Sequence, residues 1–80
     1  MAVRPEKSRL VALFAANVRQ RRLALELTQE GLAERAGLHR TYIGMIERCE
    51  KNVTIYNIEK LAKALKIKPA MLLSDGGASA

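Results

Sequence analysis

The fold of this chain is decided by residues 27–48, LTQEGLAERAGLHRTYIGMIER. The stretch Thr28–Ala36 begins with a capping hydroxyl, continues with helix-forming residues and stops at Gly37, a residue type that tolerates positive φ. A turn of about three residues follows, and apolar residues then recur at helical spacing to the end of the stretch. The sequence therefore predicts two short helices joined by a tight turn, the second beginning at His39 or Arg40.

The turn between these helices carries the most informative spacing. Ala33 stands four residues before Gly37, and so small a side chain lets two helices cross closely, because a larger one would push them apart. Helix, short glycine turn and helix form the helix-turn-helix arrangement, whose second helix can enter the major groove of DNA. An ordinary helical hairpin with a polar outer face has the same spacing, so spacing alone leaves both interpretations open.

Helices are also predicted on both sides of this unit. Ser8 can cap a first helix that runs to residue 25 or 26, and Thr54 can cap a fourth. Pro69–Leu73 suits a short fifth helix, because proline is favoured in a first turn. The apolar stripes of the first and fourth helices are Leu10, Leu13, Phe14 and Val18, and Ile55, Ile58, Leu61, Ala62 and Leu65. The predicted fold is all-α, a five-helix bundle over residues 1–73, with residues 74–80 as a flexible tail.

The charge of the chain points to a polyanionic partner. The 80 residues include 14 Lys and Arg against 8 Asp and Glu, which gives a net charge of +6. A basic small domain favours nucleic acid or an anionic lipid surface. The lipid interpretation is the weaker one, because the apolar stripe of the first helix is needed for the core and is not free to insert.

Composition excludes several classes of protein. One Cys and one His cannot build a disulfide or a zinc site, and no carboxylate cluster beside them completes a catalytic centre. We therefore expect no enzymatic activity, no metal and no cofactor. No apolar run approaches the roughly 18 residues of a membrane span, and the N-terminus lacks a secretory apolar segment, so we expect a cytoplasmic protein.

Four short motifs are the basis of a family resemblance. They are LTQ at 27–29, A-x-x-x-G at 33–37, YI-x-x-IER at 42–48 and N-x-T-I at 52–55. From residue 10 to residue 73 the chain resembles the Xre family of helix-turn-helix proteins, the phage Cro and repressor type. Within it, RTYIGMIER looks most like the controller proteins of restriction–modification systems. The resemblance implies a five-helix fold and a dimeric, sequence-specific regulator of transcription on a two-fold DNA operator. Prophage repressors and antitoxins, which bind a partner toxin, remain alternatives.

The resemblance also implies which residues contact DNA. Gln29 matches a glutamine that contacts a phosphate, Arg40 lies at the outward start of the recognition helix, and Lys51 belongs to a loop that contacts the backbone. An arginine at such a position can pair with guanine O6 and N7. The full predicted set is Arg22, Gln29, His39, Arg40, Thr41, Tyr42, Met45, Arg48, Lys51 and Asn52. Arg22 and Glu47 also match an ion pair between the first and third helices of many relatives.

Three positions depart from the family pattern. Glu26 and Cys49 stand where glycine is usual, and a non-glycine residue at positive φ costs about 1 kcal/mol. We therefore expect the turn at Glu26 to differ. Cys49 is interpreted as a plain turn residue, with a redox or dimer-linking role as the alternative. His39 stands where a Ser or Asp cap is common.

A homodimer is expected, because one recognition helix reads only a few base pairs. Its surface is predicted at the end of the fourth helix and in the fifth, at Ile67, Met71 and Leu72. Ile67 and Leu72 also suit a place in the core. RNA polymerase is a further candidate partner of such a regulator.

Overall fold

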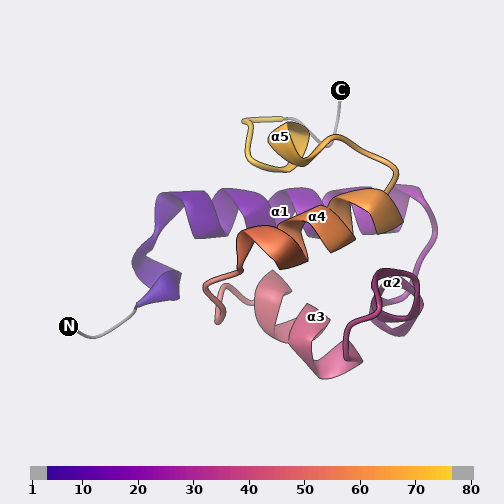
Figure 1. Cartoon of the computed structure of the whole chain (residues 1–80). Helices are drawn as coiled ribbons and strands as arrows, with labels where there is room; N and C mark the ends of the chain where they lie inside the picture. Colours follow the sequence, from indigo (N-terminus) through magenta and orange to yellow (C-terminus); the bar gives the residue numbers. More distant parts are fainter. Residues whose placement is uncertain (1–3, 77–80) are drawn as a thin grey trace.

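The computed structural model describes residues 4–76, and its elements are all helical (Figure 1). They are η1 (Pro5–Lys7), α1 (Arg9–Ala24), α2 (Gln29–Ala36), α3 (Arg40–Glu47), α4 (Ile55–Ala64) and α5 (Pro69–Leu72). Residues 4–76 contain no strand, so the predicted all-α, five-helix class is confirmed, with the 3₁₀ turn η1 as an addition. Over the same residues, no helix combines the length and the apolar character needed to cross a membrane.

Side-chain caps fix where the helices begin. The hydroxyls of Ser8, Thr28 and Thr54 each accept a hydrogen bond from the backbone N–H three residues on, at 3.2, 2.9 and 3.1 Å. α3 begins with an imidazole instead, because His39 Nδ1 accepts from the N–H of Thr41 at 3.1 Å. A cap of this kind satisfies one of the free N–H groups of a first turn and stabilises the helix by about 1 kcal/mol.

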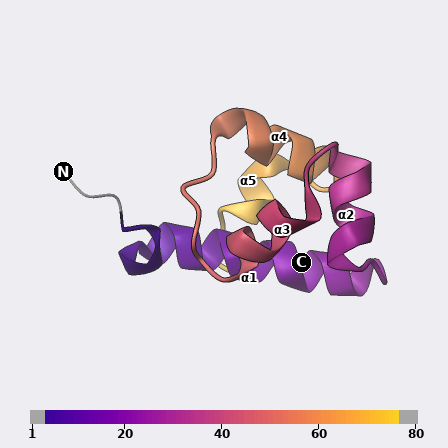
Figure 2. The same cartoon turned by 90° about the horizontal axis from the view of Figure 1, so that it is seen from below.

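The core is one cluster to which all of α1 to α5 contribute. α2 packs against α3 and α4, α1 against α3 and α5, and α4 against α5. Figure 1 shows α5 on the opposite side of the bundle from α2 and α3, and Figure 2, seen from below, shows α3 across its middle. The least exposed large side chains are Val18, Leu32, Ile43, Ile46, Leu61, Leu65 and Leu72. Burial of each contributes about 1.5–3 kcal/mol, so apolar packing holds α2 and α3 to the rest of the bundle.

Two residues of the predicted apolar stripes are exposed. Ile55 is 86% exposed and Leu10 is 52% exposed, although their helical spacing predicts burial. Ile55 is the first residue of α4 and Leu10 the second of α1. Both therefore lie at the ends of helices, where no neighbouring helix covers the stripe.

Three non-glycine residues adopt the left-handed conformation just after a helix ends. They are Glu26, Cys49 and Lys66, with φ of 57°, 63° and 55°. In each case the following N–H bonds to the carbonyl five residues back, as Leu27 does to Arg22 at 3.0 Å. The expectation that the turn at Glu26 departs from the left-handed geometry of the family is therefore wrong. The turn keeps the geometry that glycine would adopt, and helix-end hydrogen bonds offset a conformational cost of about 1 kcal/mol.

Asn17 ties the end of the described chain to α1. Its buried Nδ2 donates to the carbonyl oxygens of Leu72 and Ser74, at 2.9 Å each. At the surface, Arg9 Nη2 lies 3.5 Å from Asp75 Oδ2. The segment predicted as a tail, 74–80, therefore begins with residues that contact α1, and residues 77–80 lie outside the described part.

A buried ion pair joins α1 to α3. Arg22 Nε and Nη2 donate to the two carboxylate oxygens of Glu47 at 2.7 and 3.0 Å, and Nη1 donates to the Leu27 carbonyl at 2.8 Å. The two charged side chains are only 10% and 4% exposed. The hydrogen bond that Arg22 donates to Glu47 raises the pKa of Arg22, burial lowers it, and the negative charge of Glu47 raises it further. Because the net shift is upward, the contribution of the Arg22 charge is present below the ordinary pKa of arginine and is lost as the pH rises above it.

Breaking this pair should destabilise the fold strongly. We expect Glu47→Ala and Arg22→Ala each to lower the free energy of unfolding by about 3–5 kcal/mol, because each leaves a buried charge without its partner. Urea melts followed by circular dichroism at neutral pH measure both losses. The double variant should lose much less than the sum of the single losses, since neither charge is then left alone. Additive losses would contradict the coupling.

Candidate nucleic-acid interface

α2 and α3 are joined by a tight turn that fixes their relative position. Gly37 ends α2 with φ of 69°, and the N–H of Leu38 bonds back to the Ala33 carbonyl at 2.9 Å. Ala33 itself is buried. Side chains at the start of α3 and in the first turn of α2 therefore line one hollow together.

The start of α3 presents three exposed polar side chains, His39, Arg40 and Thr41. Because His39 Nδ1 accepts the capping hydrogen bond, a neutral ring carries its proton on Nε2, which can donate to a phosphate oxygen. Arg40 Nη1 lies 3.1 Å from Glu30 Oε2 on α2, and both side chains are exposed. Exposed pairs contribute less than about 1 kcal/mol, so a guanine edge can replace Glu30 as the partner of Arg40.

Tyr42 does not protrude with these residues. Its side chain is half-buried against the core, and its Oη accepts a hydrogen bond from Asn57 Nδ2 at 3.0 Å. Lys51 Nζ lies 6.0 Å from the centroid of the ring. Tyr42 thus lies between α4 and the loop after α3. Met45, one turn further along α3, is also half-buried.

A hollow of about 610 Å³ lies between the first turn of α2 and α3. Its lining consists of Arg22, Thr28, Gln29, Glu30, Arg40, Thr41, Gly44 and Arg48. Gly44 is buried, and a Cβ at this residue would lie 3.0 Å from Arg48 Nη1. The first turn of a helix offers N–H groups and the positive end of the helix dipole, so this hollow suits a phosphate.

The ion pair with Arg22 also orients Gln29. Gln29 Nε2 donates to Glu47 Oε1 at 3.1 Å, which holds its amide at the edge of the hollow. Arg22 itself is buried, and its Nε, Nη1 and Nη2 all donate to protein acceptors. Arg48, in contrast, has a largely exposed side chain and bonds through Nε and Nη2 to the two oxygens of Glu50, at 3.2 Å each. Its guanidinium can exchange this partner at low cost.

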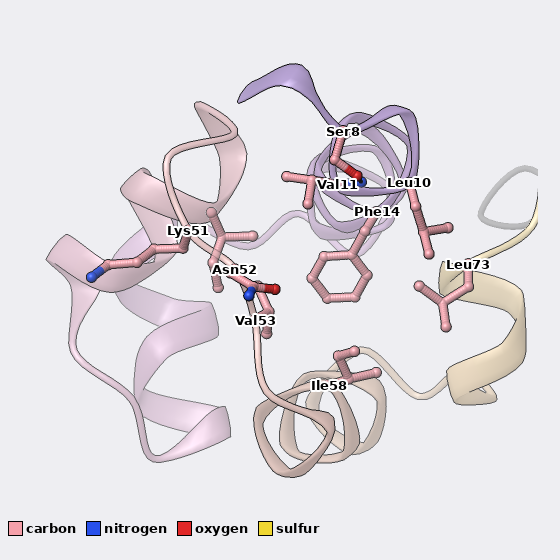
Figure 3. Close-up of a pocket in the computed structure, with 10 residues that line it drawn as sticks. Ser8, Leu10, Val11, Phe14, Lys51, Asn52, Val53, Ile58 and Leu73 are labelled. Carbon is pink, nitrogen blue, oxygen red and sulfur yellow. Dashed lines mark hydrogen bonds between the residues drawn. The ribbon is translucent and has the colours of Figure 1, made fainter. Parts of the chain in front are cut away.

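The loop between α3 and α4 carries Lys51 and Asn52 beside a second hollow of about 170 Å³, shown in Figure 3. The apolar part of its lining comprises Leu10, Val11, Phe14, Ile46, Val53, Ile58 and Leu73. Lys51 is the one charged residue of that lining, so the second hollow is mainly an apolar packing surface. Among residues 4–76, no three His, Cys, Asp or Glu side chains are grouped as metal ligands would be.

Glu30 and Asn57 belong to this region and were not predicted from the sequence. Each bonds to a predicted DNA-contacting side chain from a different helix, Glu30 to Arg40 and Asn57 to Tyr42. Acidic residues are common in a first helical turn because of the dipole alone, so Glu30 gives no distinct signal in the sequence. Asn57 lies 15 residues from Tyr42, and no sequence spacing signals that contact.

Comparison with known proteins agrees with this geometry. The helix-turn-helix family matches residues 18–72, more than half of the chain. Control protein C.SmaI of Serratia marcescens is 51% identical over 65 residues, which cover 81% of this chain and 77% of that protein.

Two solved structures share the fold. The restriction–modification controller protein C.AhdI from Aeromonas hydrophila is 45% identical, with a TM-score of 0.75, and the match covers 78% of this chain and 94% of that one. The controller protein C.Esp1396I, crystallised as a tetramer with its natural 35-base-pair operator, is 35% identical, with a TM-score of 0.77 and coverage of 82% and 87%. The chain therefore belongs to the helix-turn-helix family and, within it, to the control proteins of restriction–modification systems.

Proposed function

We propose that this control protein regulates transcription by binding a two-fold DNA operator as a homodimer, with α3 in the major groove of each half-site. The observation that carries the proposal is the start of α3, where Arg40 and Thr41 protrude beside the first turn of α2. A recognition helix meets base edges through its first residues. The operator complex of the relative C.Esp1396I supports a DNA partner for a chain of this family. RNA polymerase is a further proposed partner of the bound regulator.

The proposed contacts fall into two groups. Arg40, Thr41 and Met45 face base edges, because arginine pairs with guanine and methyl groups contact the thymine methyl. The side chains proposed for the sugar–phosphate backbone are Gln29, His39, Arg48, Lys51 and Asn52. Arg22 was predicted both to contact DNA and to pair with Glu47, and its burial and internal bonds support the second role, in which it fixes α3.

The homodimer is proposed to form on the side of the bundle that carries α5. Ile67 and Met71 are half-buried and keep apolar surface for a partner, whereas Leu72 is fully buried within the protomer and is left out of the proposed surface. Ile55 is exposed at the start of α4, which is the alternative location for the dimer interface.

Substitution of Arg40 should separate base contacts from backbone contacts. We expect Arg40→Ala to cost about 1–3 kcal/mol per half-site on the operator and to relax preference at one base pair, with a smaller loss on scrambled DNA. Titrations use an operator selected by the protein from a random-sequence pool and a scrambled duplex of the same composition. Equal losses on both duplexes would assign Arg40 to the backbone group.

Lys51→Ala should behave as the loss of a backbone contact, in contrast to Arg40→Ala. We expect it to weaken binding to both duplexes about equally and to reduce the slope of log affinity against log salt by about one unit. Lys68→Ala is the matched control once sedimentation shows that it leaves the dimer intact, because it removes the same charge just before α5, away from α2 and α3 (Figure 1). An unchanged salt slope for Lys51→Ala, or an equal change for Lys68→Ala, would remove Lys51 from the interface.

Met71→Glu should dissociate the dimer, because a carboxylate in an apolar interface is desolvated without a partner. Sedimentation velocity at micromolar concentration measures the assembly, and circular dichroism checks that the helical signal is kept. Ile55→Glu serves as the comparison at the start of α4. If only Ile55→Glu sediments as a monomer, the interface lies at α4 and not at α5.

A further inference from the structure

A side-chain hydrogen bond connects α3 to α4, which lies outside the helix-turn-helix unit. Asn57 Nδ2 donates to Tyr42 Oη at 3.0 Å, and both side chains are half-buried. The backbone of Asn57 is fixed in turn, because its N–H donates to the capping Thr54 Oγ1 at 3.1 Å. The tip of the Tyr42 side chain is therefore held by the capped first turn of α4.

The direction of this bond decides what Tyr42 can do. An amide N–H only donates, so the Tyr42 oxygen accepts and the phenolic proton is not used in the bond. Among residues 4–76, Tyr42 makes no second hydrogen bond that would engage that proton. The ammonium of Lys51 lies 6.0 Å from the ring centroid, so a positive charge lies beside the Tyr42 ring.

We propose that Asn57 is a positioning residue for DNA binding: it holds Tyr42 so that the phenolic O–H donates to a phosphate oxygen of bound DNA. The inference rests on the proposed function. A phosphate is the acceptor favoured by the geometry, because Tyr42 is set back from the protruding Arg40 and lies beside Lys51. Asn57 itself acts through Tyr42 and makes no contact with DNA.

A double-mutant cycle tests this assignment. Asn57→Ala and Tyr42→Phe should each weaken binding roughly tenfold, which corresponds to one hydrogen bond to a charged acceptor. The double variant should bind no more weakly than Tyr42→Phe alone, since Asn57 has nothing to position once the hydroxyl is absent. Alanine suits a helical position, and urea melts establish that each variant is folded under the binding conditions.

Asn52→Ala is the matched control, because it removes the same side chain from the exposed loop, where no bond to Tyr42 exists. The loss of binding free energy caused by Asn52→Ala should add in full to the loss caused by Tyr42→Phe. If Asn57 were merely structural, Asn57→Ala would lower stability and weaken binding by the same factor with and without Tyr42→Phe, and that result would overturn the proposal. Wild-type affinity for Tyr42→Phe would overturn it as well.

The choice of DNA keeps this test separate from the proposed function. A phosphate contact is independent of sequence, so the cycle is measured on both the selected operator and the scrambled duplex, with equal losses expected. Losses confined to the operator would overturn the phosphate assignment. If the protein selects no operator at all, the proposed function fails, while the cycle on the scrambled duplex still decides the role of Asn57.

Discussion

The buried pair of Arg22 and Glu47 determines where the recognition helix can lie. α3 has only eight residues, and a helix this short is not stable in isolation, so its position comes from its neighbours. Glu47 accepts hydrogen bonds from Arg22 of α1 and Gln29 of α2, and one carboxylate thus ties three helices together. Removing two charges from water costs several kcal/mol, which is offset only when their geometry is good. The pair therefore favours a single orientation of α3 as well as stabilising it.

The exposed contacts around α3 are, in contrast, ones that exchange easily. Arg40 at the start of the helix is paired with Glu30, and Arg48 just beyond its end is paired with Glu50, in exposed ion pairs of 3.1 and 3.2 Å. Such pairs contribute less than about 1 kcal/mol, so both guanidinium groups can leave them for a phosphate or a guanine. While DNA is absent, the two carboxylates lower the positive potential of this face and so weaken its attraction for DNA of any sequence. A fixed helix with exchangeable side-chain partners suits selective recognition.

Local chemistry made most of the fold predictable from the sequence. Hydroxyl caps, the left-handed Gly37 and the periodicity of apolar residues are signals within a few residues of one another, and the structure realises them. The wrong predictions of burial have a common cause. Periodicity identifies the apolar face of a helix but not where its neighbour ends, so Leu10 and Ile55 are exposed. The turn at Glu26 kept its left-handed geometry because hydrogen bonds at the helix end outweigh the preference of one residue.

The candidate interface was less accessible to sequence reasoning than the fold. Arg40 could be assigned an outward position from helical spacing alone, because it lies in the first turn after the cap. Tyr42 could not, since its position depends on Asn57, which belongs to α4 and is distant in sequence. Helix spacing describes α3 in isolation, whereas the direction of the Tyr42 hydroxyl is set by a donor outside the helix-turn-helix unit. The unit proposed to present side chains to DNA is therefore the whole bundle, and the first turn of α4 belongs to it as much as α2 does.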